Sequence, residues 1–278
     1  MHESAAKAAQ PPKPNPKPPP RPPRPSAPPP PGANRSTNAL ITCGKVPALW
    51  SVAPAIVREM RAHMSTLAEL RCRCGEVRGS VSSSSPRTVN RVVCYCDDCQ
   101  AFAHQLGHAD LLDAHGGTDV VQVAPASLKF VQGQHRIMGL RLTSNGLFRW
   151  YASCCNTPVG NTLSPAVPFV GTIVQAFDNG TQQPDDLFGK PIGAITGKYA
   201  IGDARSDSRG IKLSLMVRAI RMVLGWRLRG QSWPNPFYER DTRAPIYSVG
   251  VLSRQQREAL RRFCGPHPTA RADGHIAH

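Results

Sequence analysis

The sequence predicts a mainly β fold with short helices, and three observations lead to this prediction. Short stretches of alternating apolar and polar residues recur along the middle of the chain, as in half-buried strands. Turn-forming residues separate them, among them Ser144-Asn145-Gly146, which indicates a tight hairpin turn within 137–152. Seven of the nine cysteines fall in three close groups, whose thiols could together staple a small β domain.

The elements expected in the first part of this domain follow from the same patterns. A short helix or lead-in covers 55–70, and two strands joined by a turn at Gly75 cover 70–81. A short helix is expected at 97–106, because Asp97 and Asp98 stand where helix N-termini favour acidic residues. The remaining strands are expected at 89–93, 118–125, 127–133, in both arms of 137–152, and at 168–177.

Composition divides the chain into three parts. Of 28 prolines, half lie in residues 1–38, a tract without apolar residues able to seed a core. We therefore expect 1–63 to be a disordered, Pro-rich basic tail and lead-in, and we hypothesise that the functional chain begins near Met64. The β domain is expected at 64–180, and residues 181–278 form a basic C-terminal extension.

Two helices are expected in the extension, at about 211–228 and 254–263. The second opens on Ser253 and Gln256, which match a capping box, and Gly265 and Pro266 should end it. The first carries basic residues on several sides, so it could pack on the domain or lie on an anionic membrane. The formal net charge of +16 fits a solvated basic surface or an anionic partner, a membrane or a nucleic acid.

The three cysteine groups indicate metal binding. Cys94, Cys96 and Cys99 form a C-x-C-x-x-C run. Residues two apart on a strand point to the same face, and a turn would bring Cys99 back towards the other two. Soft thiolates select zinc, copper(I) or iron–sulfur clusters, and we expect zinc. The other groups are Cys72 with Cys74 and Cys154 with Cys155.

Seven cysteines divide naturally into four and three. Cys72, Cys74, Cys154 and Cys155 would close a structural zinc site, whereas Cys94, Cys96 and Cys99 would leave a fourth position open. An open zinc can hold an incoming thiol as a thiolate nucleophile. The nearest groups that could relay a proton are the side chains of Asp97, Asp98, His104 and His108.

Plainer interpretations of the same residues stay open. All seven cysteines could serve structural zinc without chemistry, or they could be ordinary buried thiols. Asp97 and Asp98 could simply start a helix, and the two histidines could be packed or surface residues. Cys43 and Cys264 lie outside the groups and have no assigned role. Clustered thiols without a clear signal peptide favour a reducing compartment, so we expect a cytoplasmic protein.

The cysteine spacing resembles that of a known family. Cys72-Arg73-Cys74-Gly75, the run Cys94–Cys99, and Arg149-Trp150-Tyr151 leading to Cys155-Asn156-Thr157-Pro158 resemble the glutathione-dependent formaldehyde-activating enzyme (GFA) family, which includes centromere protein V. The resemblance covers roughly 67–180. It implies a β-tent fold, with Cys72, Cys74 and Cys155 as structural zinc ligands and Cys94, Cys96 and Cys99 as ligands of a catalytic zinc.

The chain departs from the family pattern at the last cysteines, which makes it a divergent member. The family usually has C-x-x-C-G there, whereas this chain has Ala152 at the first position and Asn156 at the glycine. Cys154 is the candidate for the missing fourth thiolate. Since adjacent side chains on a strand diverge, it requires a turn at this point.

The resemblance implies a carbon–sulfur lyase that condenses glutathione, or another thiol, with formaldehyde or a small aldehyde. The alternative is a non-catalytic zinc-binding interaction module that uses its basic surface. Two zinc ions, one of them exchangeable, would favour the enzyme, and a single inert zinc would favour the module.

Overall fold

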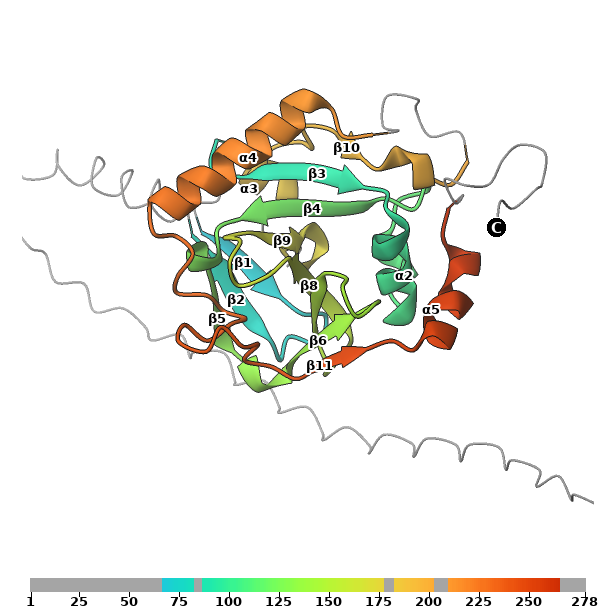
Figure 1. The fold of residues 1–278 in the computed structure, drawn as a ribbon, viewed down its shortest axis with the longest axis horizontal. Coiled ribbons are helices and arrows are strands. Elements are labelled where there is room, and N and C mark those ends of the chain that lie inside the picture. The colour runs from blue at the N-terminus through green and yellow to red at the C-terminus, as the bar shows by residue number, and fades with distance from the viewer. Residues whose placement is uncertain (1–66, 83–86, 178–182, 203–209, 266–278) are drawn as a thin grey trace, which may run out of the picture. The chain divides into compact units, whose positions relative to one another are not determined.

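The computed structural model describes residues 67–82, 87–177, 183–202 and 210–265, which belong to one compact unit within Leu49–His278 (Figure 1). The expected tail at 1–63, the start near Met64 and most of the expected lead-in at 55–70 lie outside the described residues. The described chain is mainly β, with two sheets and a few helices, which confirms the predicted fold class.

The larger sheet has eight strands in the order β10-β3-β4-β9-β8-β7-β6-β11. Its central strands pair antiparallel, whereas the two edge strands β10 and β11 pair parallel with their neighbours. In sequence order its strands are β3 (Asn90–Cys94), β4 (Thr118–Val123), β6 (Ile137–Arg141), β7 (Phe148–Ala152), β8 (Thr157–Thr162), β9 (Val170–Ile173), β10 (Ala194–Ile195) and β11 (Val249–Val251).

The smaller sheet has three strands in the order β1-β2-β5. They pair antiparallel, and the register shifts where β2 meets β5 between Arg78 and Gly79. A side chain at Gly79 would approach the carbonyl oxygen of Lys129 to 2.6 Å, so the close approach of the two strands requires glycine. Its strands are β1 (Ala68–Arg71), β2 (Arg78–Val81) and β5 (Leu128–Gln132).

The helices lie at the margins of the sheets. α2 and α5 lie side by side, and α4 runs along the sheet edge formed by β3 and β10 (Figure 1). The α-helices are α2 (Asp97–Gln105), α3 (Pro184–Phe188), α4 (Leu213–Leu228) and α5 (Arg254–Leu260). The 3-10 turns are η1 (Ala109–Leu111), η2 (Pro125–Ser127), η3 (Gln134–Arg136), η4 (Val174–Phe177), η5 (Gly197–Tyr199) and η7 (Arg261–Phe263).

The main core contains side chains of both sheets and of the segment that follows α4. Trp150 on β7 is fully buried and stacks on Phe237, with ring centroids 4.8 Å apart. Its indole nitrogen donates to Thr162 Oγ1 at 2.9 Å, and the Tyr238 hydroxyl lies 2.7 Å from the same oxygen. The polar atoms of Trp150, Thr162 and Tyr238 are therefore satisfied where this part of the extension packs on the β domain.

The C-terminal extension shares the large sheet with the β domain. β10 pairs with β3 and β11 pairs with β6, although both strands follow residue 180, where the sequence analysis ends the β domain. Neither strand shows an alternating pattern long enough to predict, because they have two and three residues. Across the described ranges, no helix combines the length and apolarity needed to cross a lipid bilayer.

Candidate metal centres

Cys72, Cys74, Cys154 and Cys155 form the first centre, here called the four-thiol group. Their sulfur atoms all lie within 4.8 Å of one another. Sγ–Sγ distances are 3.5 Å for Cys72–Cys74, 3.3 Å for Cys74–Cys154, 3.8 Å for Cys72–Cys154 and 3.9 Å for Cys154–Cys155. Four sulfurs about 2.3 Å from a tetrahedral zinc ion would be about 3.8 Å apart, so the group fits such an ion.

A residue in the left-handed backbone conformation positions the last two thiols. β7 ends at Ala152, residues 153–156 form a turn, and Asn156 has a φ of 55°. The turn brings Cys154 and Cys155 to the same centre, which adjacent residues on a straight strand could not reach together. Asparagine tolerates this conformation better than most residues, and glycine adopts it freely. Asn156 can therefore hold this turn without a glycine.

The other half of the group comes from the turn between β1 and β2. β1 ends at Arg71, so Cys72 and Cys74 lie in this turn, whereas the sequence places them on a strand. Gly75 has a φ of 78°, which closes the turn. The backbone N–H of Val77 donates to the Cys72 sulfur at 3.2 Å, which fixes the position of this sulfur in the turn.

Cys155 differs from the other thiols of this group. Burial raises its pKa, but hydrogen bonds from the Thr157 hydroxyl and from backbone amides outweigh burial and hold the pKa at about 6. The Thr157 oxygen lies 3.1 Å from the Cys155 sulfur and accepts the backbone N–H of Arg73 at 3.0 Å. Thr157 thus connects the two turns that carry the four thiols.

Cys94, Cys96 and Cys99 form the second centre, here called the three-thiol group. The Cys94 sulfur lies 3.4 Å from that of Cys96 and 3.8 Å from that of Cys99. Cys94 ends β3, Cys96 is the N-cap of α2, and Cys99 lies in the first turn of that helix. Cys94 and Cys99 are buried residues, whereas Cys96 is a partly exposed residue.

Arg149 lies beneath the three-thiol group and was given no role in the sequence analysis. The side chain is buried, and its Nη1 donates to the Cys99 sulfur at 3.7 Å and to Asn161 Oδ1 at 3.3 Å. The pKa of Cys99 lies well below its usual value because of hydrogen bonding with the thiols of Cys94 and Cys96 and because of the charge of Arg149. One buried cation thus offsets negative charge on the sulfurs.

The extension completes the surroundings of the three-thiol group. The Thr196 hydroxyl lies 3.6 Å from the Cys94 sulfur, and Cys264 donates to the carbonyl oxygen of Asp97 at 3.3 Å. The backbone N–H of Gly265 donates to Gln100 Oε1 at 2.8 Å. These residues lie about 100 or more positions away from the thiols in sequence, so no local pattern could place them there.

The carboxylates expected to relay a proton are engaged by an arginine. Arg257 Nη2 donates to Asp97 Oδ2 at 3.0 Å and to Asp98 Oδ1 at 2.8 Å. Asp98 also lies 3.8 Å from Arg149 Nη2. Both aspartates occupy the first turn of α2, so the helix-start interpretation describes their position, and they also attach α5 to α2.

The two histidines contact other groups than the sulfurs of the three-thiol group. His104 stacks on Phe263 with ring centroids 4.6 Å apart. His108 is buried, and its Nε2 lies 2.9 Å from the carbonyl oxygen of Cys155, beside the four-thiol group. α2 ends at Gln105, so His104 lies on the helix and His108 lies beyond its end.

Comparison with known proteins identifies the family. Residues 64–246, more than half of the chain, match a family described as "Family of unknown function (DUF6151)". The chain belongs to this family. The matched segment contains all seven clustered cysteines, and it extends beyond the β domain expected from the sequence into the extension.

Two further comparisons add little. No curated protein matches the chain. A crystal structure of a Rhodobacter sphaeroides protein is similar to 46% of this chain and 99% of its own, at 16% sequence identity and a TM-score of 0.30. The chain is thus a member of the DUF6151 family, and its described residues contain two thiol groups that can hold metal ions.

Proposed function

We propose that this chain is a zinc protein with two unlike sites, one structural and one open to a small-molecule ligand. The observation that carries the proposal is the number of thiols in each group, four in one and three in the other. Sulfur-only donor sets at tetrahedral spacing favour zinc among the common cellular metals. All the described cysteines are free thiols, which fits a reducing, cytoplasmic location.

At the three-thiol group we propose carbon–sulfur lyase activity of the kind implied by the resemblance to the GFA family. The substrates would be glutathione, or another small thiol, and formaldehyde or another small aldehyde. The thiol sulfur bonds to the carbonyl carbon, the carbonyl π bond breaks, and the thiol proton ends on the resulting hydroxyl. Zinc bound by Cys94, Cys96 and Cys99 would supply an acid that keeps an incoming thiol deprotonated.

The chain's own residues support this use of the site in three ways. Burial of Cys94 and Cys99 limits water to the side of Cys96, where a ligand would enter. Arg149 offsets the negative charge that three thiolates and an added thiolate would bring. Because Asp97 and Asp98 are bound by Arg257, we expect the thiol proton to reach the new hydroxyl through solvent beside Cys96.

The decisive experiment measures zinc per chain by elemental analysis, with and without glutathione, together with thiol-dependent consumption of formaldehyde. We expect two zinc ions, of which glutathione perturbs one, and activity that is lost in Cys96→Ser. Cys264→Ser is the matched control, because Cys264 lies near α2 but outside both thiol groups. A single zinc that glutathione leaves unchanged would refute the lyase proposal.

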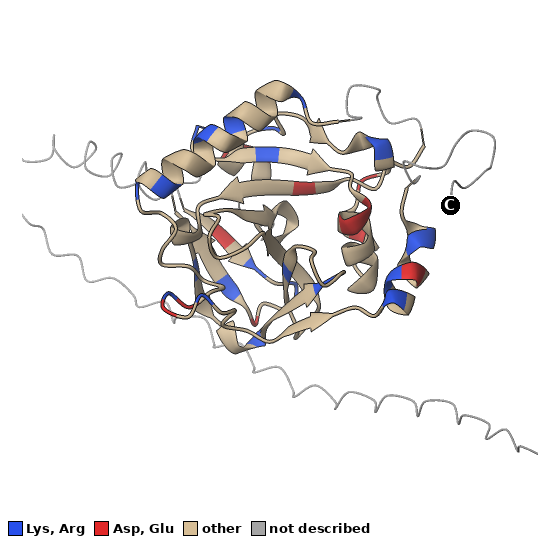
Figure 2. Cartoon of the chain, in the orientation of Figure 1, with Lys and Arg blue, Asp and Glu red and all other residues tan. Residues whose placement is uncertain are grey.

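A second candidate, a non-catalytic module that binds a surface, is favoured by helix α4. The exposed apolar stripe of α4 consists of residues spaced by three or four positions: Leu213, Val217, Ile220, Leu224 and Leu228. Such a stripe is unusual on a free surface. Arg221 and Arg227 flank it, and Figure 2 shows basic residues along α4. An apolar stripe between arginines fits the surface of an anionic lipid membrane.

This second candidate can be tested by co-sedimentation with lipid vesicles. The chain should bind vesicles containing phosphatidylserine and not vesicles of phosphatidylcholine alone, and Leu224→Asp should abolish binding. Val131→Asp introduces the same charge at an apolar side chain that is 70% exposed on β5, away from α4. An equal loss of vesicle binding in Leu224→Asp and Val131→Asp would contradict a role for the stripe. Absence of binding to anionic vesicles by the unmodified chain would contradict it as well.

A further inference from the structure

A large cavity opens beside the C-terminal end of α4. Its volume is about 610 Å³, within the range of about 300–1,000 Å³ that is usual for small-molecule sites. The segment after α4 forms most of its wall, and Arg227 of α4 and the loop before β9 form the rest. The lining residues are Pro165, Ala166, Arg227, Gly230, Ser232, Trp233, Pro234, Asn235, Tyr238, Arg240 and Arg243.

The lining is strongly cationic. It contains three arginines and no aspartate or glutamate. Among the described residues, no ion pair joins Arg227, Arg240 or Arg243 to a carboxylate. Three guanidinium groups around one space without neutralising partners attract an anion, and their fork geometry suits phosphate oxygens.

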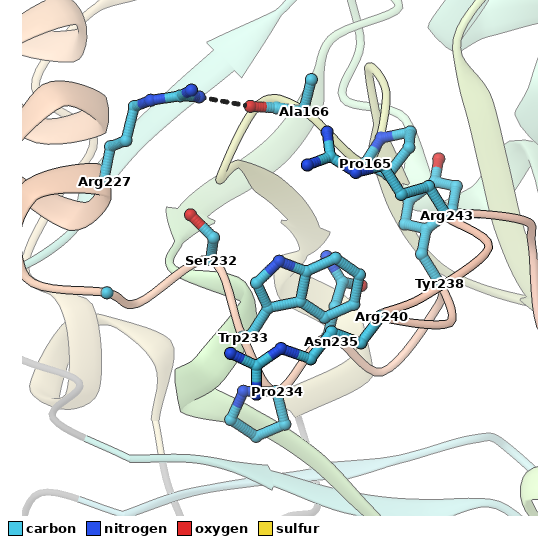
Figure 3. A pocket seen from close by; sticks show the side chains of 11 residues that line it. Pro165, Ala166, Arg227, Ser232, Trp233, Pro234, Asn235, Tyr238, Arg240 and Arg243 are labelled. Atoms are coloured by element: carbon cyan, nitrogen blue, oxygen red, sulfur yellow. Dashed lines mark hydrogen bonds between the residues drawn. The ribbon is translucent and has the colours of Figure 1, made fainter.

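Trp233 lies in the middle of this cationic lining. Figure 3 shows its indole beside the guanidinium of Arg240, while Arg243 extends towards the space between Ala166 and Trp233. Arg227 reaches from α4 and donates to the carbonyl oxygen of Ala166 at 2.9 Å. The indole is only partly buried, so a planar ring could stack on it while the guanidinium groups bind an attached anion.

Polar groups of fixed orientation complete the walls. Asn235 is buried, and its Oδ1 accepts the backbone N–H of Phe237 at 3.0 Å, which leaves the side-chain NH₂ as a donor. Tyr238 is held by its hydroxyl against Thr162. Ser232 adds a hydroxyl group to the lining. The cavity thus combines anion binding, a stacking surface and a few directed donors.

We propose that this cavity binds a small ligand that carries a phosphate group on a planar heterocycle, the chemical class of the nucleoside monophosphates. Phosphate would lie among Arg240, Arg243 and Arg227, and the base would stack on Trp233. This inference goes beyond the proposed function and does not depend on it. The cavity lies at the C-terminal end of α4. The helix α2, which starts at the three-thiol group, lies on the other side of the domain (Figure 1).

The test is isothermal titration of the full chain with AMP, adenosine and inorganic phosphate, accompanied by tryptophan fluorescence. AMP should bind with one site per chain, and adenosine and phosphate should each bind at least about tenfold more weakly, because each lacks one half of the recognition. Arg240→Gln/Arg243→Gln should weaken AMP binding by at least about tenfold. Trp233→Phe should remove most of the fluorescence response and retain part of the affinity.

The control is Arg221→Gln/Arg254→Gln, which lowers the net charge equally at two exposed arginines outside the cavity. It should leave AMP binding unchanged, and all variants should keep the zinc content and circular dichroism of the wild type. The proposal is overturned by absence of AMP binding up to about 1 mM. It is also overturned if phosphate alone binds as tightly as AMP, or if the control loses as much affinity as the cavity variant.

Discussion

At the scale of single residues, the conformation of Asn156 decides which sulfurs reach the four-thiol group. Its φ of 55° turns the chain after β7, so that both Cys154 and Cys155 face Cys72 and Cys74. Cys154 thereby joins the group as a fourth thiol that could hold a metal ion, whereas Ala152 is buried at the end of β7. Cys154, two positions after Ala152, reaches the group because it lies in the turn that follows β7 and not on the strand itself.

Replacement of that thiol should disrupt one centre only. In Cys154→Ser a hydroxyl group, a poor zinc ligand, replaces a thiolate, so we expect the chain to retain one zinc and to melt at a lower temperature. Elemental analysis and thermal denaturation check this result. Cys264→Ser removes a thiol outside both groups and should keep two zinc ions. Full zinc retention in Cys154→Ser would show that Cys154 is not a ligand.

Arg149 provides the second test at this scale. Arg149→Met preserves much of the buried volume but removes the cation beside Cys99, so zinc affinity at the three-thiol group should fall about 10- to 100-fold. Arg149→Lys retains the charge, so its zinc affinity at the three-thiol group should fall by less than that of Arg149→Met. Competition with a chromogenic chelator measures both affinities. An equal fall in zinc affinity in both variants would show that the shape of the arginine, and not its charge, supports zinc binding.

At the scale of elements, α5 shows how the extension is held to the β domain. Its N-terminus has the predicted capping box, in which Ser253 and Gln256 each accept a backbone N–H at the helix start. Its Arg257 binds the two aspartates that begin α2. The charges of the two helices therefore fix their mutual position beside the three-thiol group.

Removal of this contact should loosen α5 from α2. Arg257→Ala leaves Asp97 without its arginine and Asp98 with Arg149 alone, so we expect the free energy of unfolding to fall by about 1–3 kcal/mol. Urea denaturation gives the value. Arg254→Ala removes an exposed arginine from the same helix and should change stability by less than about 0.5 kcal/mol. If both variants lose the same stability, the contact with Asp97 and Asp98 is not what holds α5.

At the scale of the whole domain, the four-thiol group joins the two sheets. Cys72 and Cys74 lie in the turn between strands of the small sheet, and Cys154 and Cys155 lie in the turn between β7 and β8 of the large one. The two pairs are 80 or more residues apart in sequence. A metal ion held by this group would link turns distant in sequence and would stabilise the folded chain, because the unfolded chain does not form the site.

Metal removal should consequently affect the small sheet first. Treatment with a strong chelator under reducing conditions should lower the melting temperature and increase amide hydrogen exchange in β1 and β2 before it does so in β4 and β9. Hydrogen exchange followed by mass spectrometry resolves these strands. Added zinc should restore protection. Uniform loss of protection across both sheets would contradict this order and indicate a single cooperative unit.

Local patterns in the sequence were sufficient for part of this structure. Alternation and turn residues predicted the 137–152 hairpin, which appears as β6 and β7, and acidic residues predicted the start of α2. The three close cysteine groups also followed from spacing, and the structure joins two of them into one set of four. The hairpin, the helix start and each close cysteine group depend on residues near one another in the chain, where the periods of strands and helices dictate which side chains share a face.

Only the tertiary structure decided the rest. Arg149 beneath the thiols, Arg257 on the aspartates and the cationic cavity around Trp233 each combine residues from distant segments. Strands as short as β10 and β11 exist because a neighbouring strand supplies their hydrogen-bonding partners, and not because of their own sequence. The sequence by itself therefore determined the thiol chemistry and the β character, and folding determined which charges surround the thiols, because long-range contacts leave no periodic trace.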